Sequence, residues 1–327
     1  MTNLRRIGVF TSGGDAPGMN ACVRAIVRTA VAHDLEVVGI RRGYAGMIDG
    51  DFVEMDGRSV SNIVQQGGTI LKSARSDKFR TPAGRLQAAE QLRKAGIDAL
   101  AGVGGDGTFR GASLLFEEQA VSRIGCPGTI DNDLFGTDET IGYDTAMNTA
   151  IQNIDKIRDT ADAHDRVFLV EVMGRDAGFI ALNCGIGGGA ELVLVPEMFT
   201  EMEEIKARIL SLMTAQSRSS IVVVAEGDEH GGALRIEHAL HEDEAFRSVD
   251  LRVCILGHTQ RGGSPTARDR VLASRLGAAA VEALIEGHEN VMVGLVNNET
   301  KLTPLRNVFS RKKNINYELL RLTQLLS

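Results

Sequence analysis

Residues 124–133 read IGCPGTIDND, an apolar run followed by a turn that carries the carboxylates of Asp131 and Asp133. An apolar run that ends in such a loop is typical of a buried parallel strand whose carboxyl end opens on a ligand crevice. Clusters of Asp, Asn, Gly and Pro are more often simple turns or helix caps, so this stretch taken alone favours a structural role. The other loops of the chain change that interpretation.

Strand-like and helix-like patterns alternate along nearly the whole chain, which is typical of α/β architecture with parallel sheets. The strands are expected at 7–10, 36–40, 99–103, 124–126, 167–172, 192–195, 221–225, 251–256 and 291–296. The helices are expected at about 20–33, 82–96, 109–118, 144–160, 200–216 and 314–326, with another that ends near 286. Thr81 and Pro82 predict one helix start, and Gly96 predicts its end. The number of expected strands and helices is larger than one doubly wound sheet contains. The sequence therefore predicts two α/β domains that meet at a cleft.

The composition is that of an ordinary globular protein with little attraction for polyanions. The 327 residues are 43% hydrophobic and 24% charged, with a formal net charge of −7. This charge disfavours binding to nucleic acid or to a membrane surface, and 4% aromatic residues leave few platforms for base stacking. Four scattered cysteines indicate buried reduced thiols. Because the sequence has neither a signal-peptide core nor an apolar run of ~20 residues, we expect a cytoplasmic protein.

Six loops directly follow predicted strands, where parallel sheets place their ligand sites. They read TSGGDAPG (11–18), GGDGT (104–108), PGTIDND (127–133), MGRDAG (173–178), AEG (225–227) and GHTQRGGSP (257–265). The first matches neither Walker A nor GxGxxG, but its glycines would let backbone amides approach a phosphate. GGDGT adds Asp106, a hard oxygen ligand suited to Mg²⁺. The same pentapeptide occurs in NAD kinases and lipid kinases, so it predicts an ATP-using kinase without naming the acceptor.

Several basic residues are candidates for binding an anion, although an isolated Arg is more often a solvated surface residue. Arg75 and Arg175 are candidates for stabilising charge on a transferring phosphoryl group. Four more basic residues could together clamp a sugar phosphate: Arg166, Arg252, His258 and Arg261.

With these loops in order, the chain closely resembles the bacterial ATP-dependent 6-phosphofructokinases. The motifs TSGGDAPGMN, GGDG, PGTIDND, EVMGR and LGHTQRGGSP carry the resemblance over about residues 7–296. It implies a homotetramer whose subunits have two doubly wound Rossmann-like domains of mostly parallel sheet, with the active site in the cleft between them. The ATP-binding domain would comprise residues 1–141 and about 259–305, and the fructose 6-phosphate-binding domain 142–258 and about 306–327. The implied reaction is transfer of the γ-phosphate of Mg-ATP to the 1-hydroxyl of fructose 6-phosphate, the committed step of glycolysis.

The resemblance also implies a role for each matching residue. Asp131 would be the general base, and the other catalytic residues would be Arg175, Arg75 and Thr129. Asp106 would bind Mg²⁺, with Asp133 nearby. ATP would be held by Gly13, Arg75, Ser76, Gly105, Asp106, Gly107 and Thr108. The sugar phosphate would be held by Thr129, Ile130, Asp131, Met173, Gly174, Arg175, Glu226, His258, Thr259, Gln260 and Arg261, with Arg166 and Arg252 supplied by an adjacent subunit.

Two glycines bear on the phosphoryl donor. Pyrophosphate-using relatives carry Asp and Lys where this chain has Gly107 and Gly128. Glycine leaves room for the α-phosphate of a nucleotide, so ATP is the expected donor.

The family's effector site, where ADP activates and phosphoenolpyruvate inhibits, is matched only in part. The matching residues are Arg24, Arg28, Arg58, Arg158, Gly189, Ala190 and Glu191. Gly57 stands where relatives have an Arg, and Ala215, Ser217 and Arg218 stand where lysines are expected. Because fewer cations face an anionic effector, we expect weakened or altered allosteric control.

Three other functions compete with this one. A pyrophosphate-dependent phosphofructokinase would share most of the motifs. An NAD kinase would explain GGDGT but not TIDND, MGR or QRGGSP. A non-catalytic nucleotide-binding regulatory subunit should have lost the base or a metal ligand, yet Asp106, Asp131 and Arg175 are all present.

Overall fold

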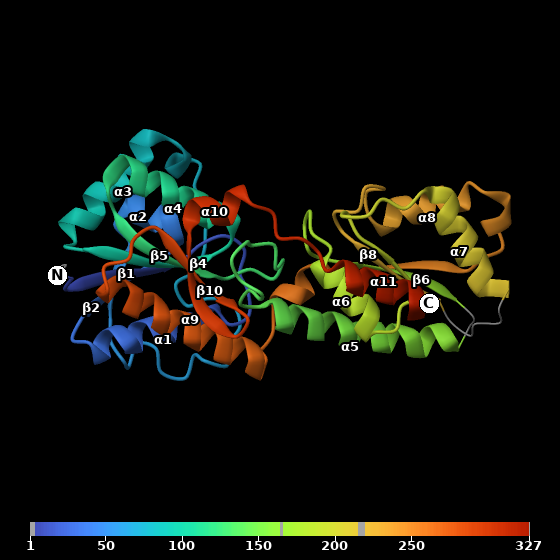
Figure 1. Cartoon of the computed structure of the whole chain (residues 1–327), viewed down its shortest axis with the longest axis horizontal. Helices are drawn as coiled ribbons and strands as arrows, with labels where there is room; N and C mark the ends of the chain where they lie inside the picture. The colour runs from blue at the N-terminus through green and yellow to red at the C-terminus, as the bar shows by residue number, and fades with distance from the viewer. Residues whose placement is uncertain (1–3, 164–165, 215–219, 327) are drawn as a thin grey trace. The chain divides into compact units, whose positions relative to one another are not determined.

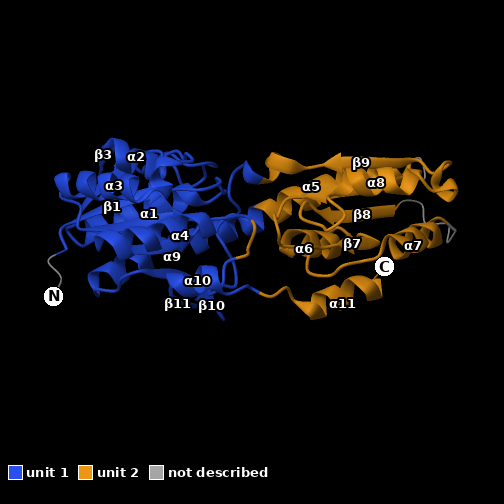
Figure 2. Ribbon diagram, turned by 90° about the horizontal axis from the view of Figure 1, so that it is seen from above, with its two compact units in different colours: residues 1–130, 134–145, 261–313 blue, residues 131–133, 146–260, 314–327 orange. Residues whose placement is uncertain are grey.

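Two compact α/β units make up the chain, and each contains its own β-sheet (Figure 1). The computed structural model describes residues 4–163, 166–214 and 220–326. Unit 1 comprises Met1–Ile130, Leu134–Thr145 and Arg261–Lys313, and unit 2 comprises Asp131–Asp133, Ala146–Gln260 and Asn314–Ser327 (Figure 2). Each unit is therefore assembled from segments that are far apart in the sequence.

Unit 1 is built on a seven-stranded sheet in the order β11-β10-β5-β4-β1-β2-β3. The strands are β1 (Arg6–Thr11), β2 (Glu36–Ile40), β3 (Phe52–Met55), β4 (Ala99–Gly104), β5 (Ser122–Pro127), β10 (Val291–Val296) and β11 (Glu299–Pro304). The five inner strands are parallel, whereas β3 and β11 pair antiparallel at the two edges. Strands β1, β4 and β5 are almost wholly buried, which explains why they read as continuous apolar runs.

Helices cover both faces of this sheet. They are α1 (Met19–Ala32), α2 (Gly43–Asp49), α3 (Pro82–Lys94), α4 (Asp106–Gln119), α9 (Ala267–Ile285) and α10 (Leu305–Ser310), with a short 3-10 helix η1 (Lys78–Arg80). Helix α1 packs against α9, while α2 packs on α3, and α4 contacts both α3 and α10. Figure 1 shows the α1–α9 pair on the opposite face of the sheet from the other group.

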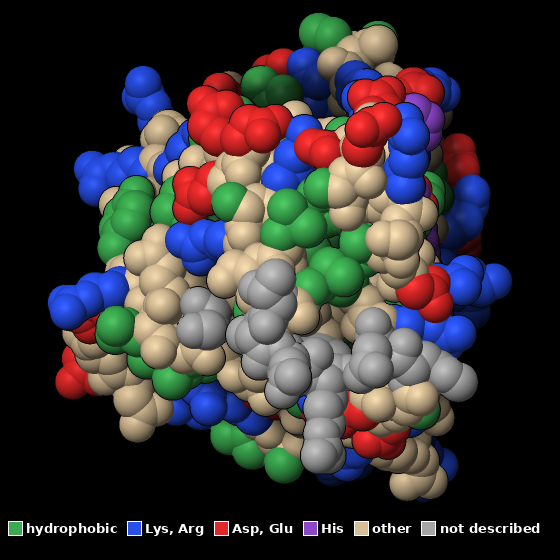
Figure 3. Space-filling model, turned by 90° about the vertical axis from the view of Figure 1, so that its right-hand side faces the viewer, with side chains coloured by type: hydrophobic (Ala, Val, Ile, Leu, Met, Phe, Trp, Pro, Cys, Tyr) green, Lys and Arg blue, Asp and Glu red, His purple; other side chains and the backbone are tan. Residues whose placement is uncertain are grey.

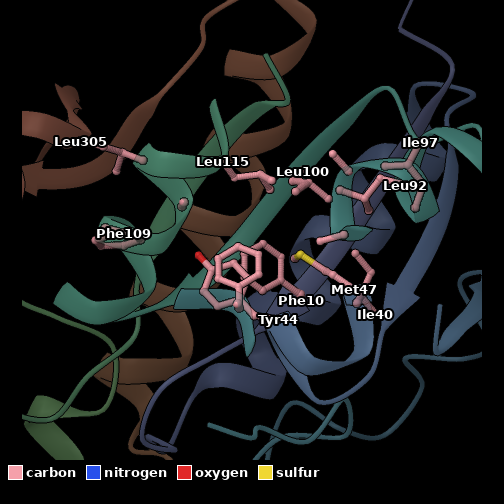
Figure 4. Close-up of a cluster of buried hydrophobic side chains, with 14 of the residues drawn as sticks. Phe10, Ile40, Tyr44, Met47, Leu92, Ile97, Leu100, Phe109, Leu115 and Leu305 are labelled. Atoms are coloured by element: carbon pink, nitrogen blue, oxygen red, sulfur yellow. The ribbon is translucent and has the colours of Figure 1, made fainter. Parts of the chain in front are cut away.

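One hydrophobic core cluster of unit 1 lies between the sheet and the second group of helices (Figure 4). The ring of Tyr44 on α2 lies 5.4 Å from that of Phe10 on β1, and it stacks on Phe79 at 3.9 Å. The hydroxyl group of Tyr44 donates a hydrogen bond to the backbone carbonyl of Thr108. The core thereby contacts the first turn of α4, at the GGDGT loop.

Unit 2 is built on a four-stranded parallel sheet in the order β7-β8-β6-β9. The strands are β6 (Val167–Val172), β7 (Leu192–Leu194), β8 (Ser220–Ala225) and β9 (Leu251–Ile255). Its helical elements are most of α5 (Tyr143–Asp162), α6 (Phe179–Gly187), α7 (Met202–Thr214), α8 (Ala233–His241), α11 (Tyr317–Leu326), and the 3-10 helices η2 (Glu244–Phe246) and η3 (Gly257–Arg261). Apolar side chains of β6, β7 and β8 pack against α7 and α8 to form the core.

The predicted fold class, α/β with mostly parallel sheets, is confirmed. Strands β6 and β10 have the predicted bounds, and Thr81 caps α3 by accepting a hydrogen bond from the amide of Gly84 at 3.1 Å. The predicted helix at 200–216 begins at Met202, and residues 215–216 lie outside the described part of the chain. The sequence pattern missed several elements: α2, β3, α6, α8, β11 and α10.

Three expectations from composition can be compared with the structure. On the face shown in Figure 3, acidic and basic side chains are interspersed rather than gathered into one field of a single sign. Across the described residues, no helix combines the length and the apolar character that crossing a bilayer requires. All four cysteines are free thiols, and three of them are buried.

Candidate active site

Four of the six loops that the sequence singled out lie at the switch points of the two sheets, and each unit is described by itself. In unit 1 the strand order reverses between β1 and β4, which are followed by TSGGDAPG and GGDGT. In unit 2 it reverses between β6 and β9, which are followed by MGRDAG and GHTQRGGSP. Open parallel sheets bind ligands at such points, outside the carboxyl ends of the strands.

In unit 1 the loop after β1 and the segment around Arg75 form an open pocket of about 400 Å³. The hydroxyl group of Ser73 ties them together by donating a hydrogen bond to the carbonyl of Gly13 at 2.5 Å. The lining residues are Gly13, Gly14, Asp15, Thr69, Ser73, Ala74 and Arg75. Gly13 has a φ of 88°, a conformation that favours glycine. The structure thus brings together two predicted ATP contacts, Gly13 and Arg75, whereas Ser76 accepts a hydrogen bond from the amide of Phe79.

The GGDGT loop ends at the amino terminus of α4. Gly105 is the N-cap residue, and Asp106, Gly107 and Thr108 form the first turn. The first amides of a helix have no intrahelical acceptor, and the helix dipole adds positive potential there, so this turn is suited to bind phosphate. The buried hydroxyl of Thr108 has no hydrogen-bond partner among the described residues.

Asp106, the residue predicted to bind Mg²⁺, is partly exposed and paired with one arginine. Its Oδ2 atom pairs with Nε of Arg110 at 2.7 Å, and about a third of its side chain is exposed (34%). Arg110 also donates a hydrogen bond to the backbone carbonyl of Phe309, and its guanidinium lies over the aromatic ring of Phe309, 5.0 Å from the ring centroid. Among the described residues no cluster of three or more metal-ligating side chains occurs. A single carboxylate fits Mg²⁺, which usually takes one or two protein carboxylates together with substrate phosphates and water.

Thr129 lies beside the GGDGT loop. A Cβ atom at Gly105 would be 3.4 Å from that of Thr129, and the Thr129 side chain is buried. Its carbonyl accepts a hydrogen bond from the hydroxyl of Thr140 at 2.6 Å. Unit 1 thus gathers the predicted ATP loops and the first predicted substrate contact at one edge of its sheet, and Ile130 follows in the core.

In unit 2 the structure pairs the two residues predicted to perform the chemistry. Oδ2 of Asp131 lies 3.6 Å from Nε of Arg175. The Asp131 side chain is 4% exposed, whereas that of Arg175 is 59% exposed. The carboxylate is therefore fixed within the protein, while the guanidinium is accessible to a ligand.

The backbone at Arg175 adopts a strained conformation that its neighbours hold. Arg175 has a φ of 52°, which is uncommon for a residue other than glycine. Oε1 of Glu226 accepts hydrogen bonds from the amides of Arg175 (2.7 Å) and Gly174 (3.2 Å). Gln260, which is fully buried, accepts from the amide of Met173 at 2.9 Å. Glu226 and Gln260, predicted as substrate contacts, therefore both hold the backbone of the MGR segment.

The remaining predicted contacts in the loop after β9 differ in their surroundings. His258 and Thr259 are exposed, and the Thr259 hydroxyl donates to the carbonyl of Leu256 at 2.7 Å. Arg261 belongs to unit 1, where its Nη1 donates to the carbonyl of Asp15 at 3.2 Å. The same guanidinium lies against Gly14, where a Cβ atom would meet Nη1 at 2.5 Å. Arg261 thus packs on the TSGGDAPG loop.

Arg166 and Arg252 are not brought to the other predicted contacts of unit 2. Arg166 directly precedes β6 and Arg252 is the second residue of β9, so both lie at the amino-terminal edge of the sheet. Arg175 lies beyond the opposite end of β6, about 20 Å away for a strand of this length. Asp250 bridges the pair, with Oδ2 2.7 Å from Nε of Arg166 and Oδ1 2.7 Å from Nε of Arg252. The hydrogen bond from Arg166 lowers the pKa of Asp250, and Arg252 adds to this effect.

The predicted effector residues fall into two groups. Arg24 and Arg28 lie one turn apart on α1, and Arg58 is exposed, all in unit 1. In unit 2, Arg158 pairs with Glu191 at 3.1 Å and donates to the carbonyls of Gly188 and Gly189, next to Ala190. Ala215, Ser217 and Arg218 lie outside the described residues.

Sequence reasoning missed several residues that contact the predicted site residues but were not themselves predicted to bind or to catalyse. Ser73 and Thr69 line the pocket of unit 1, Asp250 bridges two predicted substrate arginines, and Arg110 pairs with Asp106. Ser73 stands two positions before Arg75 in LKSAR, and Arg110 follows Asp106 by one helical turn. Those spacings were the available signals; Asp250 stands two positions before Arg252, but Arg166 comes near it only in the folded sheet.

Comparison with known proteins gives one consistent family. The family model for phosphofructokinase matches residues 6–284. The chain is 57% identical over 324 residues to the ATP-dependent 6-phosphofructokinase 1 of Thermus thermophilus, covering 99% of this chain and 100% of that protein. It is 53% identical to the ATP-dependent 6-phosphofructokinase of Cytophaga hutchinsonii, covering 99% and 98%.

Solved structures agree with these relatives. Phosphofructokinase from Pichia pastoris, solved in the T-state, is 35% identical with a TM-score of 0.87, and the match covers 95% of this chain and 36% of that longer chain. A pyrophosphate-dependent phosphofructokinase from Marinobacter aquaeolei has a TM-score of 0.82 over 96% of this chain and 86% of its own, but only 22% identity. The second likeness concerns the fold alone.

Proposed function

The chain belongs to the phosphofructokinase family, and from this premise we propose how its residues carry out the reaction of an ATP-dependent 6-phosphofructokinase. As such an enzyme the chain is a phosphotransferase with an alcohol group as acceptor. It transfers the γ-phosphate of ATP to the 1-hydroxyl of fructose 6-phosphate. In this proposal unit 1 binds ATP and unit 2 binds the sugar phosphate, which follows the roles that the resemblance implies for the two domains.

The observation that carries the proposal is the pairing of Asp131 with Arg175 in unit 2. In the proposed mechanism Asp131 accepts the proton of the 1-hydroxyl as that oxygen attacks, and Arg175 stabilises charge on the transferring phosphoryl group. Phosphoryl transfer needs alignment and positive charge more than covalent chemistry, and a fixed carboxylate beside an accessible guanidinium meets this need. Thr129 contacts the substrate from the preceding turn of the same loop.

ATP binding is assigned to the loops of unit 1. The amides of Gly105 to Thr108 cradle the phosphates, and Gly13, Arg75 and Ser76 complete the site. Asp106 would hold Mg²⁺, which supplies positive charge at the β- and γ-phosphate oxygens when it is bound. Gly107 supports ATP over pyrophosphate, because a Cβ atom there would meet nothing within 4 Å and the space stays open for a nucleotide.

The sugar phosphate requires groups from two copies of the chain in this proposal. Arg175, His258 and Gln260 follow the carboxyl ends of β6 and β9, whereas Arg166 and Arg252 lie at the amino ends. One sugar phosphate does not span about 20 Å, so Arg166 and Arg252 serve the site of an adjacent subunit in a homotetramer. The enzyme works in the cytoplasm, and ADP and phosphoenolpyruvate regulate it weakly because cations are missing from the effector site.

A coupled assay tests the function directly. We expect turnover with Mg-ATP and fructose 6-phosphate, and little with pyrophosphate as donor or NAD as acceptor. Pyrophosphate outperforming ATP would overturn the donor assignment, and phosphorylation of NAD would overturn the acceptor. Adding ADP and phosphoenolpyruvate to the same assay tests the regulation, for which strong inhibition or activation is the contradicting result.

A further inference from the structure

Three helices begin within unit 1 around one buried carboxylate. They are α1, which follows TSGGDAPG, α5, whose first residues belong to unit 1, and α9, which follows QRGGSP. The carboxylate belongs to Asp269 in the first turn of α9 and is 1% exposed. A Cβ atom at Gly18, the N-cap of α1, would lie 3.6 Å from Cβ of Asp269. Three positive helix ends therefore face one negative side chain.

Asp269 caps the start of α5 from another helix. Its Oδ1 accepts from the amide of Gly142 at 2.8 Å, and its Oδ2 accepts from the amide and the hydroxyl of Thr145 at 2.8 and 2.5 Å. The cap of α9 is bound to the same place, because the amide of Thr266 donates to Oγ1 of Thr145, and the Thr266 hydroxyl donates to Asp144. Hydrogen bonds thus join the first turns of α5 and α9 into one junction.

This junction continues into the loop that carries the chemistry. Residues 140–142, directly before α5, run alongside residues 127–129: Gly128 forms a parallel bridge with Ile141. The amide of Ile141 donates to the carbonyl of Pro127 at 2.8 Å, and the hydroxyl of Thr140 donates to the carbonyl of Thr129 at 2.6 Å. A shift at Asp269 would therefore reach the backbone of Thr129, two residues before Asp131.

We propose that Asp269 is a positioning residue for phosphoryl transfer, which fixes the loop 127–133 through the segment 140–142. The inference rests on the proposed function, since it concerns the loop that carries Asp131. In this role Asp269 does not contact the substrate itself. Its carboxylate accepts three hydrogen bonds within the protein, and its effect passes through Gly142 and Thr145 to Thr140 and Thr129. A misplacement of about 1 Å in an aligned site can cost up to ~10²-fold in rate.

The obvious alternative is that Asp269 only stabilises the fold. A buried cap whose loss leaves donors unsatisfied costs roughly 1–3 kcal/mol in stability, whether or not the loop moves. A rate effect that persists in fully folded protein, and that is coupled to Thr140, separates the two roles.

The test is a double-mutant cycle on the full chain with Asp269→Asn and Thr140→Val. Each single variant should lower kcat at least about tenfold, with KM for ATP within about twofold of the wild type, because alignment is lost rather than nucleotide binding. The double variant should lose little more than the worse single variant, because both changes interrupt one path. Multiplicative losses, or a normal kcat in folded Asp269→Asn, would overturn the inference.

Asp98→Asn is a control for the loss of a carboxylate that accepts backbone amides at an exposed position. Asp98 also accepts two backbone amides, those of Arg5 and Arg6 at 2.9 Å each, but it precedes β4 at the opposite edge of the same sheet. This variant should keep kcat. If Asp269→Asn does not fold, Thr145→Val removes one hydrogen bond of Asp269 and should show a smaller loss with the same coupling to Thr140→Val. An inactive wild-type chain in the ATP and fructose 6-phosphate assay would instead count against the proposed function.

Discussion

Gly227 lies against the backbone of Arg175, so closely that a Cβ atom at position 227 would meet the Arg175 carbonyl oxygen at 1.9 Å. The chain after β8 therefore needs a glycine here for Arg175 to keep its φ of 52°. Glu226, the preceding residue, holds the same turn through the amide of Arg175. A glycine and a carboxylate next to each other in the sequence thus fix the conformation of the proposed phosphoryl-stabilising arginine.

We expect Gly227→Ala to lower kcat nearly as far as Arg175→Ala does, because the added methyl group displaces the Arg175 backbone. Steady-state kinetics of the two single variants and the double variant measure this. The double variant should be no worse than Arg175→Ala alone. Wild-type turnover in Gly227→Ala would show that the guanidinium position does not depend on this contact.

Asp131→Asn should lower kcat by at least ~10²-fold, the lower end of what a general base contributes. The amide has nearly the same shape, so the fold and the binding of ATP should be kept, which calorimetry with an ATP analogue can check. Near-normal turnover in this variant would remove Asp131 from the role of base.

A mixture of two inactive variants tests whether Arg252 serves a neighbouring site. Asp131→Asn and Arg252→Ala are each expected to be severely impaired, the second through a raised KM for fructose 6-phosphate. Dissociated and reassembled together, they should regain part of the activity, because some sites then combine an intact Asp131 with an intact Arg252 from another copy. Subunits that assemble into mixed oligomers without any recovery would contradict the shared site.

Gly107→Asp should weaken ATP binding without disturbing the fold. The space around position 107 is open, so the side chain is accommodated, but its charge faces the phosphates of the nucleotide. We expect KM for ATP to rise at least about tenfold while KM for fructose 6-phosphate changes little. Gly128 is unsuited to this experiment, because a Cβ atom there would meet Val103 at 2.8 Å. An unchanged KM for ATP would show that Gly107 does not face the nucleotide.

The stability of the protein should depend on pH through Asp269. Burial raises the pKa of Asp269 from 3.8 to about 6, and the nearby Asp144 contributes in the same direction although the hydrogen bonds from Thr145 and Gly142 oppose it. A raised pKa in the folded state means that this group favours folding when it is protonated, and that the contribution is lost as the pH rises through about 6.

On acidification through that pH, wild type should therefore gain stability relative to Asp269→Asn. The gain should approach about 1.4 kcal/mol per pH unit between the two pKa values. Denaturant unfolding of both proteins over this range measures it, and Asp98→Asn serves as the reference. If the free energies of unfolding of wild type and Asp269→Asn changed in parallel with pH, burial would not raise the pKa of Asp269.

Much of this architecture is predictable because its local chemistry agrees with the fold. The inner strands are apolar runs between turn residues, and the loop after β5 pairs Gly and Pro with two carboxylates. The missed elements lack such signals. Helix α6, FIALNCGIG, is apolar all round and shows no period, while the edge strand β11, ETKLTP, is mostly polar.

The site was predictable only as far as its residues are close in the sequence or match the family motifs. Asp131, Arg175 and Asp106 lie in the loops that follow β5, β6 and β4, at the carboxyl ends of these strands. The hydrogen bonds of Asp269 to Gly142 and Thr145 span more than 120 positions, and nothing local in ARDRVLAS distinguishes this acid from a helix-capping residue on the surface. Its burial comes from packing among three helix ends.

The order of segments within unit 1 has a consequence for biosynthesis. Helix α1 packs on α9, and β5 pairs with β10, yet α9 and β10 are synthesised only after residues 146–260 of unit 2. While the ribosome makes unit 2, the nascent chain carries an apolar helix face and an open strand edge that await their partners, which is the state most prone to misassembly. The sheet of unit 2 is complete first, and the first 130 residues are where a chaperone would be needed longest.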